Sequence, residues 1–279
     1  MKLCVIGDPV EHSLSPAMHN AALRELGLEH TYEKIRVKPE ELKKFIERIR
    51  SGEISGASIT IPHKQSILPL MDGLSKEAEL IGAVNTVQRK ENKLVGHNTD
   101  GIGCVNALEE AGVEVSGKSA LILGAGGAAR AIAFTLALSG AEALEIANRT
   151  PEKAEALARD VNEETGLEVA AGDLSNLGSK IRNVDILINT TSVGMKGTQE
   201  DKTLVKAVDM HPGLVVNDIV YTPRKTLLLK EAGKAGCKIV EGRGMLVHQG
   251  AEQFRIFTGK DAPVEVMREA LNEALGEKN

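Results

Sequence analysis

Residues 119–134 constrain the fold of this chain more than any other segment. They open with an apolar run, 120–123, which is long enough for a buried strand. The chain then turns through Gly124-Ala125-Gly126-Gly127 and continues from Ala128 as an alanine-rich series. We therefore predict a strand, a glycine turn and a helix whose first N–H groups face an anion, with Gly126 leaving room for a pyrophosphate.

A glycine motif of this kind also occurs in turns that bind no ligand, so the sequence after it matters. Residues 143–147 have the character of the next parallel strand, about one helix length downstream, as a βαβ unit requires. Strands alternating with helices predict an α/β fold with a doubly wound, Rossmann-type sheet that binds a dinucleotide beyond the carboxyl ends of its strands. The further strands are expected at 168–171, 184–188, 214–217 and 238–240.

The composition excludes several other classes of protein. A chain of 279 residues with 42% apolar residues can form two globular domains. The net charge of -5 and the 2% aromatic content argue against nucleic-acid binding. The first apolar run is too short for a signal peptide or a membrane span, so we expect a cytoplasmic protein with no membrane partner. The three widely spaced cysteines, Cys4, Cys104 and Cys237, predict buried thiols and no metal site.

The first 101 residues predict a separate α/β domain. Its expected elements are strands at 3–6, 31–37 and 57–61, a hairpin of 83–88 with 94–95, and helices at 15–26 (N-capped by Ser15), at 39–49 and after the cap Ser75. The last two helices, 245–257 and 263–275, have no strand left to cover, so at least one should return to this domain. The predicted domains are 1–101 plus about 245–279, and 102–244, with a hinge at 112–117.

The residues after the second strand of the doubly wound sheet favour NADP over NAD. An NAD site usually has Asp or Glu there to bind the ribose 2′-hydroxyl, whereas this chain has Asn148, Arg149, Thr150 and Lys153. Arg149 can grip a 2′-phosphate or stack on adenine. The alternative is that Thr150 only caps the next helix and Arg149 is a solvated charge. Three more polar or glycine-bearing loops, 189–195, 218–223 and 241–245, follow successive strands and should lie beside the cofactor.

Lys64 is placed unusually, at the start of a helix, where its charge opposes the helix dipole. Asp100 is its natural charge partner, and such a pair can pass the alcohol proton as a hydride leaves. The alternatives are a solvated lysine and an N-capping aspartate.

With these segments placed, the chain resembles the shikimate dehydrogenases over essentially its whole length. The resemblance is carried by Ser13-Leu14-Ser15-Pro16, Thr60-Ile61-Pro62-His63-Lys64, Gly82-Ala83-Val84-Asn85-Thr86, Asn98-Thr99-Asp100-Gly101, Gly124-Ala125-Gly126-Gly127, Asn148-Arg149-Thr150 and Gln249. It implies NADPH-dependent reduction of 3-dehydroshikimate to shikimate, in aromatic amino-acid biosynthesis, by a monomer or homodimer with no metal. The resemblance also implies that residues 1–101 and 245–279 bind the substrate and that residues 102–244 bind NADP.

The resemblance also assigns individual residues. Lys64 and Asp100 would be catalytic, and the substrate would be bound by Ser13, Ser15, Thr60, Lys64, Asn85, Asp100, Tyr221 and Gln249. The cofactor would be bound by Gly124, Ala125, Gly126, Gly127, Ala128, Asn148, Arg149, Thr150, Lys153, Ile219 and Gly242. The chain departs from the family at Ser58, where Asn is usual and a looser strand end is expected, and at Gly250, where Ala is frequent. A quinate/shikimate dehydrogenase and a non-catalytic dinucleotide sensor remain the alternatives.

Overall fold

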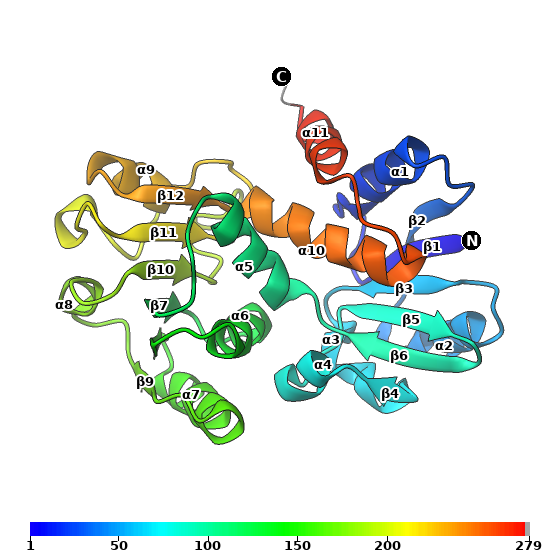
Figure 1. The fold of residues 1–279 in the computed structure, drawn as a ribbon, viewed down its shortest axis with the longest axis horizontal. Coiled ribbons are helices and arrows are strands. Elements are labelled where there is room, and N and C mark those ends of the chain that lie inside the picture. The colour runs from blue at the N-terminus through cyan, green and yellow to red at the C-terminus, as the bar shows by residue number, and fades with distance from the viewer. Residues whose placement is uncertain (277–279) are drawn as a thin grey trace. The chain divides into compact units, whose positions relative to one another are not determined.

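The computed structural model describes residues 1–276, which form two compact units (Figure 1). Unit 1 comprises Met1–Thr99 and the residues from Val247 on, and unit 2 comprises Asp100–Leu246. Each unit contains its own six-stranded sheet, which confirms the α/β class. No helix within the described part of the chain has both the length and the apolar character of a membrane span.

The sheet of unit 1 has the order β2-β1-β3-β5-β6-β4. Strands β1, β2 and β3 are parallel, whereas β5 and β6 form the predicted hairpin and β5 runs antiparallel to β3. The strands are β1 (Lys2–Gly7), β2 (Thr31–Arg36), β3 (Gly56–Ile59), β4 (Gly73–Leu74), β5 (Thr86–Lys90) and β6 (Lys93–His97). The helices are α1 (Ser15–Glu25), α2 (Leu42–Arg50), α3 (His63–Ser66), α4 (Lys76–Ile81), α10 (Gly242–Thr258, from Val247 on in this unit), α11 (Val264–Ala274) and the 3-10 turns η1 (Pro39–Glu41) and η2 (Leu68–Leu70).

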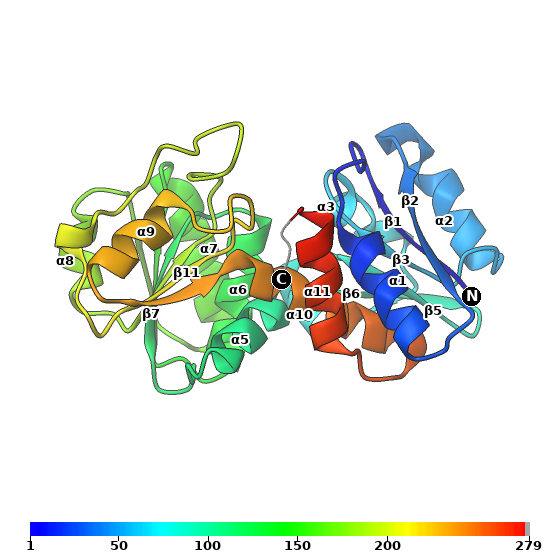
Figure 2. The same ribbon diagram turned by 90° about the horizontal axis from the view of Figure 1, so that it is seen from above.

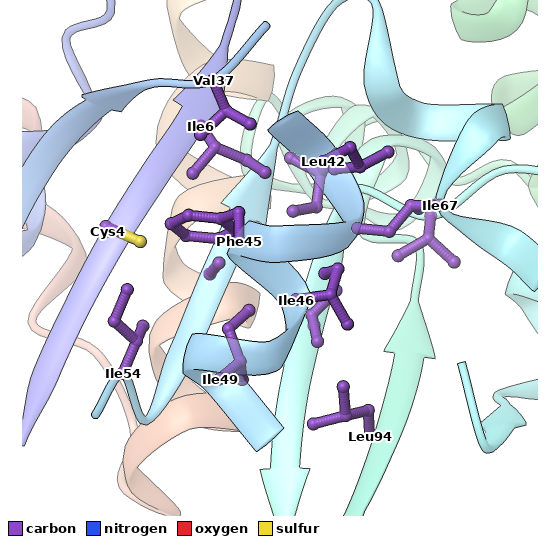
Figure 3. Close-up of a cluster of buried hydrophobic side chains, with 14 of the residues drawn as sticks. Cys4, Ile6, Val37, Leu42, Phe45, Ile46, Ile49, Ile54, Ile67 and Leu94 are labelled. Carbon is purple, nitrogen blue, oxygen red and sulfur yellow. The ribbon is translucent and has the colours of Figure 1, made fainter. Parts of the chain in front are cut away.

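Helix α2 covers one face of this sheet and supplies much of its core. Leu42, Phe45, Ile46 and Ile49 recur at helical spacing, all four are buried, and they point toward the strands (Figure 3). Burial of such apolar side chains stabilises the unit by roughly 1.5–3 kcal/mol each before the entropy of ordering is subtracted. The predicted cap of the short helix α4 is confirmed, because the Ser75 hydroxyl accepts a hydrogen bond from the Ala78 N–H at 3.2 Å.

The predicted N-cap of helix α1 is wrong. Leu14 occupies the cap position without a side-chain hydrogen bond, and Ser15 is already the first helical residue. The Ser15 N–H instead donates to Ser13 Oγ at 3.4 Å. Helix α1 packs beside α11, as both views show (Figures 1 and 2).

His19, on α1, is fully buried and stacks on Tyr32 with 4.2 Å between the ring centroids. Neither of its ring nitrogens forms a hydrogen bond to another described group. Burial lowers the pKa of His19 from 6.5 to about 3, and the nearby Gln253 side chain opposes this shift. His19 is therefore neutral in the folded protein at neutral pH.

This histidine should make the protein sensitive to acid. The pKa of His19 is lower in the folded than in the unfolded chain, so the unfolded chain binds the proton more tightly and stability falls as the pH drops from about 6.5 toward 3. At pH 5 the loss should be about 2 kcal/mol. Urea unfolding at pH 5 and pH 7 should show a smaller difference for His19→Leu than for the wild type, while exposed His12→Ala should not change the difference. Equal pH dependence of His19→Leu and wild type would contradict the prediction.

The sheet of unit 2 has the order β12-β11-β10-β7-β8-β9 and is parallel throughout, which confirms the doubly wound prediction. Its strands are β7 (Ser119–Leu123), β8 (Ala143–Ala147), β9 (Val169–Gly172), β10 (Ile186–Asn189), β11 (Val215–Asp218) and β12 (Lys238–Glu241). Its helices are α5 (Asp100–Glu110), α6 (Gly127–Leu138), α7 (Pro151–Thr165), α8 (Leu177–Ile181), α9 (Leu227–Lys234), the first turn of α10 and the 3-10 turn η3 (Ala207–Asp209).

Helix α5 packs directly on α6 (Figure 1). Gly101 lies at this contact, where a Cβ would stand 1.9 Å from Thr135 Oγ1 and 2.5 Å from the Ala131 carbonyl oxygen. The predicted hinge at 112–117 is wrong, because this segment lies inside unit 2 and buries Val113 and Val115. Of the three cysteines, which form no disulfide, Cys4 and Cys104 are buried as predicted, but Cys237 is only half-buried.

Candidate functional site

The carboxyl ends of five strands in unit 2 lie in one register, so the residues that follow them share one edge of the sheet. Leu123 pairs with Ala147 and Asn189, Asn189 pairs with Asp218, and Asp218 pairs with Glu241. The next residue after each of these ends belongs to the glycine turn, to the Asn148 segment or to one of the three predicted loops. The prediction that the loops lie at successive strand ends is thereby confirmed.

The glycine turn has the form that a dinucleotide pyrophosphate requires. Gly124 has a φ of +112°, and a Cβ there would lie 2.5 Å from Thr190 Oγ1, which itself donates to the Leu123 carbonyl at 2.7 Å. A Cβ at Gly126 or Gly127 would meet nothing within 4 Å, and none of the described side chains caps the N-terminus of α6. The open side of the turn therefore leaves the first N–H groups of α6 available to a phosphate.

The three residues directly after β8, 148–150, carry hydrogen-bond donors and a positive charge but no acid, and the first acid, Glu152, lies within α7. The Asn148 N–H donates to the Gly172 carbonyl at 3.0 Å, and Asn148 Nδ2 donates to the Thr150 carbonyl at 2.9 Å. Thr150 occupies the N-cap position of α7, but its side chain forms no capping hydrogen bond. Arg149, Thr150 and Lys153 are exposed. These residues fit the 2′-phosphate of NADP, because guanidinium, ammonium and hydroxyl groups all donate to phosphate oxygens.

Asp218 organises the loop that follows β11. Its Oδ1 accepts hydrogen bonds from Asn189 Nδ2 at 2.9 Å and from the Val220 N–H at 3.1 Å, and its Oδ2 accepts one from Thr226 Oγ1 at 2.6 Å. Asp218 is fully buried, and this burial raises the pKa of its carboxyl although the three hydrogen bonds oppose the shift. Asp218 therefore fixes the loop that carries Ile219 and Tyr221 to the loop after β10.

Gly242 brings the start of α10 against the same loop. A Cβ at Gly242 would lie 2.6 Å from both the carbonyl carbon and the oxygen of Ile219, so only glycine fits here. Buried Arg243 donates from Nε to the Tyr221 carbonyl at 3.5 Å. Tyr221 itself is 36% exposed. Unit 2 thus brings Ile219, Gly242 and Tyr221 together at the sheet edge that carries the glycine turn.

Unit 1 gathers three of the eight predicted substrate residues, Thr60, Asn85 and Gln249, at one edge of its own sheet. Thr60 follows β3, Asn85 precedes β5, and Thr99 follows β6; these meet because β3 and β5, and β5 and β6, are antiparallel. The Ile59 N–H donates to the Asn85 carbonyl at 2.7 Å. Thr99 then joins Asn85 to Gln249, since its Oγ1 accepts from Asn85 Nδ2 at 3.0 Å and donates to the Gln249 carbonyl at 3.1 Å.

Ser13, Ser15 and Lys64 also belong to unit 1. Ser13 Oγ donates to Ser15 Oγ at 3.3 Å, which leaves two adjacent hydroxyls suited to a carboxylate. Lys64 lies in α3, is half-buried, and is held through its main chain, because its carbonyl accepts from the Val84 N–H at 2.8 Å. Asp100, buried in the first turn of α5, and Tyr221 belong to unit 2.

Sequence reasoning assigned no role to Thr99, Asp218 or Gln253. Thr99 hydrogen-bonds to Gln249, Gln253 hydrogen-bonds to Asn85, and Asp218 joins the loops after β10 and β11. Thr99 and Asp218 lie inside motifs that the sequence does single out. Gln253 follows Gln249 by four residues on a helix, which places the two on one face. A Cβ at Gly250 would meet the methyl ends of Met267 and Met18 at 3.3 and 3.4 Å and His19 Nε2 at 3.8 Å, so an alanine there would require only small shifts of two flexible side chains.

Comparisons with known proteins agree with this arrangement along the whole chain. Residues 5–87 match the model of the shikimate dehydrogenase substrate binding domain, 105–225 that of shikimate / quinate 5-dehydrogenase, and 242–271 that of the shikimate 5'-dehydrogenase C-terminal domain. The shikimate dehydrogenase (NADP(+)) of Methanothermobacter thermautotrophicus is 49% identical over 97% of this chain and 95% of its own.

Solved structures give the same result. Shikimate 5-dehydrogenase from Listeria monocytogenes, in complex with shikimate and NAD, has a TM-score of 0.93 and 40% identity, covering 97% of this chain and 96% of its own. The Thermus thermophilus enzyme, in complex with NADP(H) and shikimate, has a TM-score of 0.88 and 39% identity, covering 98% and 99%. The chain belongs to the shikimate dehydrogenase family of NADP-dependent oxidoreductases.

Proposed function

We propose that this chain catalyses the reversible, NADPH-dependent reduction of 3-dehydroshikimate to shikimate, a step of aromatic amino-acid biosynthesis. The observation that carries the proposal is that one chain contains both a sheet edge suited to NADP and a sheet edge suited to the substrate. One edge has a glycine turn and a neighbouring strand end without an acid, and the other groups hydroxyl and amide side chains suited to a polyhydroxylated acid.

Lys64 and Asp100 are the proposed catalytic pair. Bound NADPH supplies the hydride that reduces the carbonyl carbon. Lys64 donates a hydrogen bond to the carbonyl oxygen and transfers the proton to that oxygen as charge develops on it; in the reverse direction it accepts the proton. Asp100 orients the Lys64 ammonium and accepts from a ring hydroxyl of the substrate.

The remaining assignments follow the same division. Ser13, Ser15 and Tyr221 bind the substrate carboxylate, and Thr60, Asn85, Asp100 and Gln249 bind the ring hydroxyls. NADP lies on residues 124–128, on Asn148, Arg149, Thr150 and Lys153, and on Ile219 and Gly242. Unit 1 is the proposed substrate domain and unit 2, which begins at Asp100, is the proposed NADP domain. The protein acts in the cytoplasm as a monomer or homodimer.

Initial rates with shikimate and with quinate, each with NADP and with NAD, test the proposal. Rapid reduction of NADP by shikimate, without comparable activity with quinate or with NAD, supports the proposal. Turnover of quinate, or a preference for NAD, would replace it with a broader quinate/shikimate dehydrogenase. Binding of NADP without turnover of either alcohol would favour a dinucleotide sensor and sink the enzymatic proposal.

Arg149→Ala should reduce the preference for NADP over NAD. Loss of a charge-assisted hydrogen bond to the 2′-phosphate should raise the KM for NADP by roughly 10- to 100-fold and leave the KM for NAD within about twofold. Arg159→Ala, an exposed arginine two turns along α7, is the matched control and should change neither constant. An unchanged NADP preference in Arg149→Ala would mean that this guanidinium is only a solvated charge.

A further inference from the structure

A chain of buried hydrogen bonds crosses unit 1 from β2 to α10 and ends on a site residue. The Tyr32 hydroxyl donates to Ser58 Oγ at 2.6 Å, and Ser58 Oγ donates to Gln253 Oε1 at 2.7 Å. Gln253 Nε2 in turn donates to the main-chain carbonyl of Asn85 at 3.2 Å. All four residues are buried, none more than 4% exposed. Because water does not reach them, a bond lost from this chain leaves a buried polar group without a partner.

The donor and acceptor roles along this series of hydrogen bonds follow from the chemistry of the side chains that form it. Burial raises the pKa of the Tyr32 hydroxyl, which keeps it protonated as the first donor. Ser58 has a single proton and gives it to Gln253, so its oxygen is free to accept from Tyr32. Only an amide can then accept at Oε1 and donate at Nε2; a carboxylate lacks the donor and an aliphatic side chain lacks both.

The series of hydrogen bonds from Tyr32 to Asn85 ends in the part of unit 1 that contains the proposed substrate residues. Asn85 Oδ1 accepts from the Thr99 N–H at 2.9 Å, and Thr99 Oγ1 donates to the Gln249 carbonyl. Helix α10 is therefore fastened to the sheet edge at two points one turn apart, at Gln253 through Asn85 and at Gln249 through Thr99. A shift of α10 at the first point would move Gln249 relative to Asn85.

Ser58 lies in β3, one residue before the strand ends, and the looser strand end expected at this position stays a prediction. Its hydroxyl uses both its donor and its acceptor capacity at short distances. We propose that Ser58 and Gln253 are positioning residues, which fix Asn85 and Gln249 in the geometry needed by the substrate hydroxyls. The proposal rests on the proposed function of those two residues.

Steady-state kinetics of Gln253→Met and Ser58→Ala test this role. Each variant breaks the chain without touching a proposed ligand group, so the KM for shikimate should rise about tenfold, as expected when binding groups are misplaced by a fraction of an ångström. The KM for NADP should stay within about twofold, because the cofactor residues lie in unit 2. Ser58→Thr keeps the hydroxyl and should restore the shikimate KM.

Two comparisons separate positioning from general destabilisation. Gln88→Met is the matched control: Gln88 Nε2 also donates to a carbonyl of α10, that of Ile256 at 2.5 Å, but it does not contact Asn85. This variant should lower the melting temperature and leave the shikimate KM unchanged. The double variant Ser58→Ala with Gln253→Met should have a KM close to that of either single variant, because both break one chain.

Equal rises in both KM values, or a shikimate KM that also rises in Gln88→Met, would overturn the positioning role. If Gln253→Met does not fold, Tyr32→Phe removes only the first hydroxyl, and the proposal then requires a smaller rise confined to shikimate. A wild-type protein without shikimate turnover would overturn the proposed function itself. Normal wild-type turnover with unmoved variant KM values would overturn the positioning role alone.

Discussion

Replacing Lys64 with alanine should lower the turnover number for shikimate oxidation by about 10²–10⁴-fold, the usual effect of losing a general acid or base. The KM for shikimate should change far less, because several other proposed side chains bind the substrate. Asp100→Ala should fall within the same range. Pre-steady-state mixing with NADP should show that the loss lies in the chemical step and not in product release.

The control for this experiment is Lys44→Ala, which removes an exposed lysine from α2 in the same unit. It should leave both kinetic constants unchanged. A large rise in KM with unchanged turnover in Lys64→Ala would make Lys64 a binding residue only. If Lys64 and Asp100 act as one unit, the double variant should be little slower than either single variant.

Gly101→Ala should destabilise unit 2 by about 1–3 kcal/mol, the usual range for overpacking a closely packed contact. The new methyl group would overlap Thr135 Oγ1 and the backbone oxygen of Ala131, so moving one side chain cannot relieve it. The two helices α5 and α6 must separate instead. Thermal and urea unfolding should both report the loss.

Gly233→Ala is the matched control, because Gly233 lies in the helix α9 and a Cβ there meets nothing within 4 Å. It should stabilise the protein by roughly 0.5–1 kcal/mol through helix propensity. Adding Thr135→Ala to Gly101→Ala should restore only part of the stability, since the Ala131 oxygen remains in the way. Gly101→Ala with wild-type stability would show that α5 can shift on α6 without loss.

The strands of unit 2 were predictable because each is a short apolar run that ends at a polar or glycine residue. Ala143–Ala147 matches its predicted range at both ends. The β10 strand begins two residues later than expected, because the Val184 N–H closes a turn onto the Ile181 carbonyl and does not join the sheet. The hinge was predicted wrongly because segment 112–117 begins and ends with glycine, which is typical of a flexible linker. The two valines between these glycines, Val113 and Val115, are buried and hold the segment in unit 2.

The candidate site was predictable where a motif follows a strand, and unpredictable where partners are distant in the chain. The motifs single out Asn85 and Gln249 as candidate site residues. They do not show that Thr99, which contacts Asn85, also donates a hydrogen bond to the Gln249 carbonyl, 150 residues away in the sequence. Nor do they show that Ser58 finds its partner 195 residues away. Such pairs arise from strand order and helix placement, which local patterns do not encode.

The division of the chain into units has a consequence for its biosynthesis. Unit 1 is built from residues that precede unit 2 in the sequence and from residues that follow it, and Gln249 and Gln253 belong to the second group. A ribosome therefore delivers every residue of unit 2 before it delivers the segment that completes the first sheet edge. Nascent chains usually fold their N-terminal domain first. Here the second unit can finish folding while the first still waits, with its apolar surface uncovered, for the final helices to emerge.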